Sequence, residues 1–65
     1  LYLYAAQASN ALQNYKAALS HLDNGIDFVI DKPTRKKYYL AYAKSYTGLN
    51  NTQKATYYKK MAAQL

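Results

Sequence analysis

The side chains that could take part in catalysis are few in this chain of 65 residues. There is one histidine, His21, with three acidic residues and no cysteine, glutamate or tryptophan. Ser20 is next to His21, but neighbours on a helix point about 100° apart, so the pair does not form a nucleophile and its base. A zinc site would need a second ligand three or four residues from His21, where Asn24 and Gly25 stand. We therefore predict that the chain is not an enzyme and uses no cofactor or metal.

The basic residues are the more distinctive chemical feature. Eight of the nine basic residues, and no acidic residue, fall within residues 32–65. A basic half favours acidic peptides, nucleic acid or anionic lipid as partners, and the alternative is a solvated face balanced by acids elsewhere in a parent protein. The acidic residues Asp23, Asp27 and Asp31 follow each other at a spacing of four. That spacing predicts an acidic stripe on one helix, close to the basic residues across the following loop.

Helices must position these side chains, because the apolar residues recur with a helical and not an alternating period. The pattern predicts four helices, over about residues 1–12, 14–31, 35–48 and 52–65. Pro33 disfavours a helical conformation in the residue before it, so we expect one helix to end near Asp31 and the next to begin with Thr34 as its N-cap. The short connections predict that neighbouring helices pack antiparallel.

The two halves of the chain share a pattern of small residues at a common shift of 37. The pairs are Ala6 with Ala43, Ala18 with Ala55, and Gly25 with Ala62. Small side chains are needed where the backbones of two helices approach closely. Weaker breaks in the helical pattern lie at Gln13-Asn14 and at Leu49-Asn50-Asn51, where asparagine favours caps and left-handed turns.

In these positions the chain resembles the tetratricopeptide repeat family. The matching residues of the first half are Tyr2, Ala5, Ala6, Tyr15, Ala18, Leu22 and Gly25, and those of the second half are Tyr39, Tyr42, Ala43, Tyr46, Ala55 and Ala62. The resemblance covers nearly the whole chain, although the shift is 37 and the family's usual repeat is about 34 residues. Ser9 stands where the family prefers tyrosine, and Lys59 where a large apolar residue is usual. Gln13 and Asn50 replace the glycine of the family's turn.

The resemblance implies an all-α fold in a single domain, residues 1–65. Two antiparallel helix–turn–helix repeats, about residues 1–31 and 35–65, are expected to be joined by a loop at about 32–34 and stacked as a short right-handed α-solenoid. Because the chain begins at Leu1 and not at Met, we expect it to be part of a longer protein.

The resemblance also implies a concave groove, lined by the first helix of each repeat, that binds a segment of a partner protein or peptide. The positions that correspond to this groove are Leu3, Tyr4, Gln7, Asn10 and Ala11, followed by Lys37, Leu40, Ala41, Lys44 and Thr47. Gln7 and Asn10 could bond a peptide backbone, and the two lysines suggest an acidic or carboxylate-terminated partner. We expect that reversing the charges of Lys37 and Lys44 weakens binding without unfolding the domain.

Three alternative functions remain open from the sequence. The chain could be the sensor or oligomerisation part of a peptide-responsive transcriptional regulator, or a basic helical module on nucleic acid. It could also have a purely structural role, packing on neighbouring repeats to extend a solenoid or associating with a second copy of itself. Nucleic acid is the less favoured partner, because Tyr39, Tyr42 and Tyr46 follow the period of the core and are not left free to stack on bases. Tyr38 and Tyr57 are less well explained by the core. No stretch is long and apolar enough to span a membrane, and we expect a cytoplasmic location.

Overall fold

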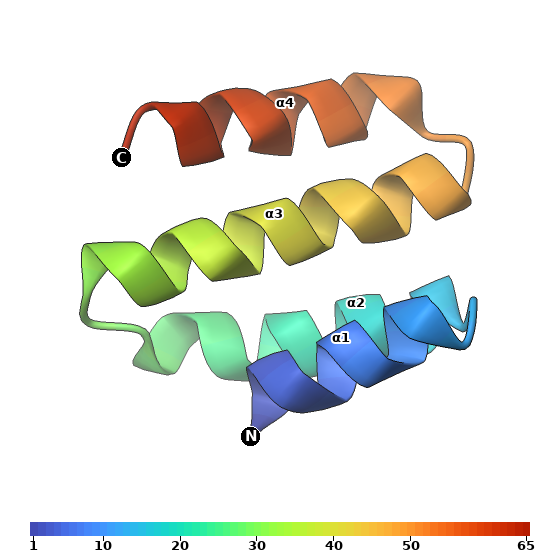
Figure 1. The fold of residues 1–65 in the computed structure, drawn as a ribbon, viewed down its shortest axis with the longest axis horizontal. Coiled ribbons are helices and arrows are strands. Elements are labelled where there is room, and N and C mark those ends of the chain that lie inside the picture. Colours follow the sequence, from blue (N-terminus) through green and yellow to red (C-terminus); the bar gives the residue numbers. More distant parts are fainter.

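The computed structural model describes all residues, 1–65, and is built from helices alone (Figure 1). The elements are α1 (Tyr2–Ala11), α2 (Tyr15–Gly25), a short 3-10 helix η1 (Ile26–Phe28), α3 (Lys32–Gly48) and α4 (Thr52–Ala63). The helices α1 and α2 pack on each other at one end of the molecule, α3 runs through the middle, and α4 lies on the far side of α3. The prediction of an all-α fold with four helices is confirmed.

The turns between α1 and α2 and between α3 and α4 share one geometry. Gln13 and Asn50 are the two residues with positive φ, both at 62°, which is the left-handed conformation that commonly ends a helix. The N–H of Asn14 donates to the carbonyl of Ser9, and the N–H of Asn51 donates to that of Tyr46, each at 2.8 Å. The same bonds thus recur at the shift of 37 seen in the sequence, so both predicted breaks are confirmed.

Each turn leads directly into the next helix through an asparagine cap. The side-chain oxygen of Asn14 accepts from the N–H of Ala17 at 3.4 Å, and that of Asn51 accepts from Lys54 at 3.2 Å. Free N–H groups in the first turn of a helix need such acceptors. One asparagine therefore closes the preceding turn with its backbone and begins the next helix with its side chain.

The connection between α2 and α3 differs from the prediction. The second helix ends at Gly25 and not near Asp31, and η1 follows it. The N-cap of α3 is Asp31, whose carboxylate accepts from the N–H of Thr34 at 2.9 Å, so Thr34 is not the cap. Pro33 is accommodated because a proline in the first helical turn removes an N–H that has no partner within the helix. Residues 32–34 are therefore helical, and the loop precedes them.

This connection also removes the predicted acidic stripe. Asp27 lies in η1, and Asp31 lies at the start of α3, so neither shares a helix with Asp23. Asp31 faces the positive end of a helix dipole, where an anion is stabilised, and not the negative end that the sequence pattern suggested. Arg35 donates to the carbonyl of Val29 at 3.0 Å and thereby holds the loop against α3.

The six small residues of the sequence pattern are all buried, namely Ala6, Ala18, Gly25, Ala43, Ala55 and Ala62. Large side chains fill the space beside them. The ring of Tyr15 lies over Gly48, and Gly25 contacts the side chains of Tyr2 and Tyr38. Burying apolar surface in such close contact is the main favourable contribution to folding in a chain of this size.

Tyrosine rings make up much of the remaining core. Tyr58 of α4 stacks on Tyr42 and Tyr46 of α3, with ring centroids 4.6 Å and 5.7 Å apart and nearly parallel planes. This arrangement is one of the preferred geometries for aromatic pairs. Tyr38, which the sequence did not place in the core, is buried beside Gly25, whereas Tyr57 is 56% exposed.

Candidate functional site

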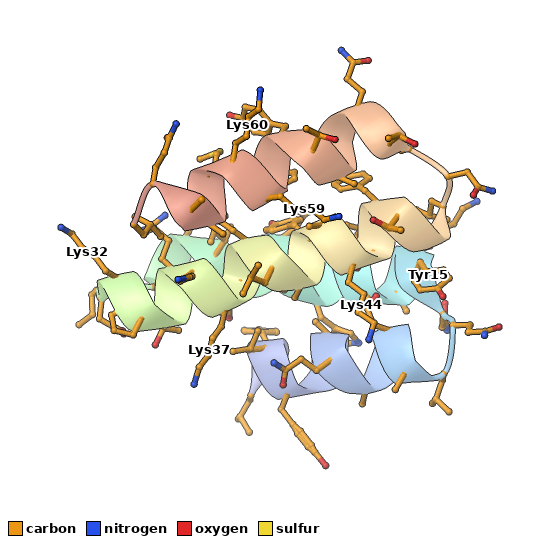
Figure 2. All side chains as sticks on the ribbon, turned by 45° about the horizontal axis from the view of Figure 1, so that its top comes forward. Tyr15, Lys32, Lys37, Lys44, Lys59 and Lys60 are labelled. Atoms are coloured by element: carbon orange, nitrogen blue, oxygen red, sulfur yellow. The ribbon has the colours of Figure 1, made fainter.

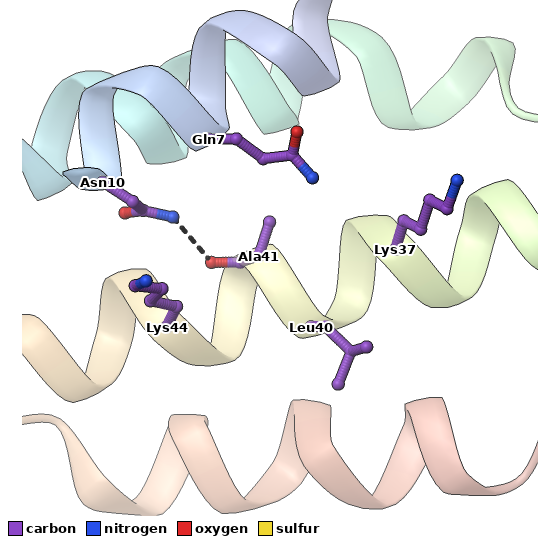
Figure 3. A pocket seen from close by; sticks show the side chains of 6 residues that line it. All are labelled: Gln7, Asn10, Lys37, Leu40, Ala41 and Lys44. Carbon is purple, nitrogen blue, oxygen red and sulfur yellow. Dashed lines mark hydrogen bonds between the residues drawn. The ribbon is translucent and has the colours of Figure 1, made fainter.

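A groove lies between α1 and α3, with a volume of about 250 Å³ (Figure 3). Gln7 points from α1 toward α3, and the ammonium group of Lys37 extends from α3 toward α1. The complete lining is Gln7, Asn10, Lys37, Leu40, Ala41 and Lys44. All six are among the ten residues that the sequence predicted for partner binding, so the fold brings more than half of that set together.

The floor of the groove is a buried polar network. The amide of Asn10 donates to the carbonyl of Ala41 at 3.3 Å and accepts from the hydroxyl of Ser45 at 2.7 Å. Asn10 and Ser45 are almost completely buried. An unpaired polar group at such depth would cost about 1–3 kcal/mol, so these bonds fix the separation of α1 and α3. Asn10 thus joins the two helices, and its expected bond to a peptide backbone would compete with this network.

The walls of the groove are exposed and basic. Gln7, Lys37, Leu40 and Lys44 all have exposed side chains, with Leu40 at 48% exposure. No carboxylate lines the groove. Two of the three acids of the chain are bonded elsewhere, since Asp31 caps α3 and Asp23 accepts from the hydroxyl of Tyr42 at 2.7 Å. The groove therefore offers two cations, one amide and one aliphatic side chain, a set suited to an acidic segment with an apolar residue.

The other four predicted residues do not line this groove. Leu3 is half-buried and packs against the core, Tyr4 is 67% exposed, and Ala11 is exposed at the end of α1. Thr47 lies beside the groove, and its hydroxyl donates to the carbonyl of Ala43 at 2.8 Å. The predicted surface is therefore divided, with its central part in the groove and its ends outside it.

A second depression, of about 370 Å³, lies on the α4 side of the same helix. Its lining residues are Tyr15, Leu40, Ala43, Lys44, Thr47, Gly48 and Lys59. Tyr15 and Lys59 were not among the predicted binding residues. Lys59 was noticeable in the sequence only as a cation at a position where the resembled family has an apolar side chain. Its proximity to Lys44 depends on how α4 packs on α3, which no local pattern reveals.

The hydrogen bond between Tyr42 and Asp23 fixes α2 against α3 behind the groove. Burial raises the pKa of the Tyr42 hydroxyl far above its ordinary value, and the hydrogen bond to Asp23 raises this pKa further. Burial likewise raises the pKa of Tyr58. These phenols stay protonated at neutral pH and act as packing and hydrogen-bonding groups. His21 is half-buried, and no three His, Cys, Asp or Glu side chains lie close enough together to hold a metal ion.

No protein-family model matches the chain, and neither the curated proteins nor the solved structures include a significant match. The tetratricopeptide resemblance, the division into two repeats and their solenoid stacking therefore stay predictions. None of the four helices is both long enough and apolar enough to cross a bilayer.

Proposed function

We propose that the chain binds an acidic segment of a partner protein in the groove between α1 and α3. The observation that carries the proposal is the pair of exposed lysines, Lys37 and Lys44, in a groove lined by no carboxylate. They are seven residues apart on one helix, or about 10.5 Å along its axis. Leu40 lies between them and offers an apolar contact, and Gln7 offers an amide that can bond a peptide backbone.

Two further features support a scaffold of helical repeats. The turns at Gln13 and Asn50 share their backbone conformation and their hydrogen bonds at one common shift. The small residues of both halves are buried at matching positions. A repeat unit that presents a rigid groove suits binding without catalysis, because stacked helices form an extended surface. No specific observation favours the regulator or the nucleic-acid alternative, and most of the α3 tyrosines that could stack on bases pack on Tyr58.

The groove is tested by reversing its charges. An array of twelve-residue peptides, each with two acidic residues and one leucine, serves as the probe. Its strongest binder is then measured by fluorescence anisotropy. We expect the double variant Lys37→Glu, Lys44→Glu to weaken binding by at least about five-fold, since each exposed ion pair contributes up to about 1 kcal/mol and the reversed charge repels the peptide. The helical circular dichroism should not change, because both side chains are exposed.

The matched control is Lys32→Glu with Lys60→Glu. It changes the net charge by the same amount, but both residues lie outside the groove and point away from it (Figure 2). We expect this control to reduce binding only slightly. Equal losses for the two double variants would show that binding depends on overall charge, and would contradict the proposal. If the affinity for DNA fell steeply as the salt concentration rose, and the affinity for peptides did not, nucleic acid would be favoured as the partner instead.

A further inference from the structure

The two depressions on either side of α3 adjoin each other and share lining residues. Leu40 and Lys44 line both of them. Leu40 points from α3 toward α4, away from the side on which Gln7 lies (Figure 3). A segment bound in the α1–α3 groove can therefore continue over Leu40 into the second depression without leaving the surface.

Lys59 gives the second depression a cation of its own. Its side chain lies across α3, whereas the side chain of the neighbouring Lys60 points away from α3 (Figure 2). Lys44 and Lys59 come from different helices and line the same depression, and no acidic residue lines it with them. Two like charges beside one depression repel each other, and a bound anion relieves that repulsion. The ring of Tyr15, which lies over Gly48, adds an aromatic wall beside the cations.

We propose that the partner segment carries two acidic side chains, one on each side of an apolar side chain. The apolar side chain contacts Leu40, the first acid binds between Lys37 and Lys44, and the second binds between Lys44 and Lys59. This inference rests on the proposed function and specifies the ligand of that site. The charge complementarity of the two depressions and their shared lining residues are the observations that carry it.

The spacing of the acids follows from the helix geometry. Packed helices lie about 8–10 Å apart, so the segment must span a comparable distance as it crosses α3. An extended chain rises about 3.3 Å per residue. The two acids should therefore be about two or three residues apart, with the apolar residue between them.

The test uses acetylated, amidated nonapeptides with leucine at the central position. One or two aspartates are placed within three residues of that leucine, on either side of it. Asparagine replaces each aspartate in the controls. Binding is measured at low ionic strength to the chain itself and to Lys59→Gln and Lys60→Gln, which remove one charge from adjacent positions. We expect two-acid peptides to bind Lys59→Gln about three-fold more weakly, and Lys60→Gln almost unchanged, as for a single exposed ion pair.

The one-acid peptides make the result specific. The single aspartate either precedes or follows the leucine, which gives two sets of peptides. We expect Lys59→Gln to weaken the binding of one set and to leave the binding of the other set unchanged. The inference is overturned if Lys59→Gln and Lys60→Gln have equal effects on two-acid peptides, or if every one-acid peptide responds to Lys59→Gln. Both results leave the proposed function intact when Lys37→Glu with Lys44→Glu still weakens binding. Equal effects of the two Lys→Glu double variants overturn both proposals.

Discussion

At the scale of single residues, hydrogen bonds at the helix ends define where each element begins. Asn14, Asn51 and Asp31 each accept from an N–H three residues later. Asp31 is the only one of the three that titrates. The hydrogen bond from Thr34 holds the pKa of the Asp31 carboxyl below its ordinary value, and the nearby Lys37 contributes least. A lowered pKa in the folded state means that folding favours the carboxylate.

This shift predicts an acid-dependent loss of stability. The contribution of Asp31 is present above its unfolded pKa of 3.8 and is lost as the pH falls through the lower, folded pKa. Asp31→Asn keeps a good capping side chain but removes the titration. We expect the variant to be less stable than the parent chain at pH 7, and this difference to shrink below pH 3.8. Urea unfolding at a series of pH values measures it, and a constant difference would contradict the assignment.

At the scale of the elements, small residues set how closely the helices pack. A Cβ added at Gly25 would lie 2.6 Å from the Cβ of Tyr2 and would also clash with the hydroxyl of Tyr38. At Gly48 the three atoms nearest to the added Cβ all belong to the outer end of the Tyr15 ring, which is half-buried. Both glycines are the last residues of their helices, so the helix propensity of alanine adds only a small and similar gain at either position.

The two glycines should therefore respond differently to alanine. We expect Gly25→Ala to destabilise the chain by about 1–3 kcal/mol, because α1 and α3 must move away from α2. Gly48→Ala should cost less or be neutral, since only one ring is displaced. Denaturant unfolding of both variants measures which one loses more free energy of unfolding. A greater loss for Gly48→Ala would show that the contact between α1 and α2 is less tight than the structure indicates.

The sequence predicted these elements well where the signals are local. The turns at Gln13 and Asn50 were located from asparagines and from the shift of 37, because a cap depends on only a few consecutive residues. The end of α2 was placed too late, since the helical period of residues 26–29 continues through η1 and does not distinguish the two kinds of helix. The Asp31 cap was missed because Pro33 was interpreted as a break, although a first helical turn tolerates proline.

At the scale of the whole molecule, α4 is attached mainly through α3. In Figure 1 it lies on the side of α3 away from α1, and the ring of Tyr58 is the centre of its contact with α3. Tyr39, Tyr42 and Tyr46 all pack around that ring. The position of Lys59, and with it the second depression, therefore depends on this aromatic cluster.

Truncating Tyr58 should loosen one helix more than the others. We expect Tyr58→Ala to cost about 2–4 kcal/mol, as for the loss of a large, partly buried ring. Hydrogen exchange of the α4 amides should become faster than that of α1, because local opening follows the weakest contacts. Tyr57→Ala removes an adjacent, 56% exposed ring that meets Tyr58 edge-on with centroids 5.1 Å apart, and it serves as the comparison, with a smaller change expected. Uniform acceleration in all helices would show that α4 does not open separately.

The sequence by itself determined the four helices, the two matching turns, the buried small residues and the basic second half. These properties depend on periodicity and on neighbours along the chain. The resemblance to tetratricopeptide repeats implied ten partner-binding positions, and the six residues that line the α1–α3 groove are among them. Only the tertiary structure decided that Asn10 joins α1 to α3, that Tyr38 is buried and that Lys59 and Lys44 line one depression. Each of these depends on how separate helices pack, and packing is fixed by contacts between residues far apart in the chain.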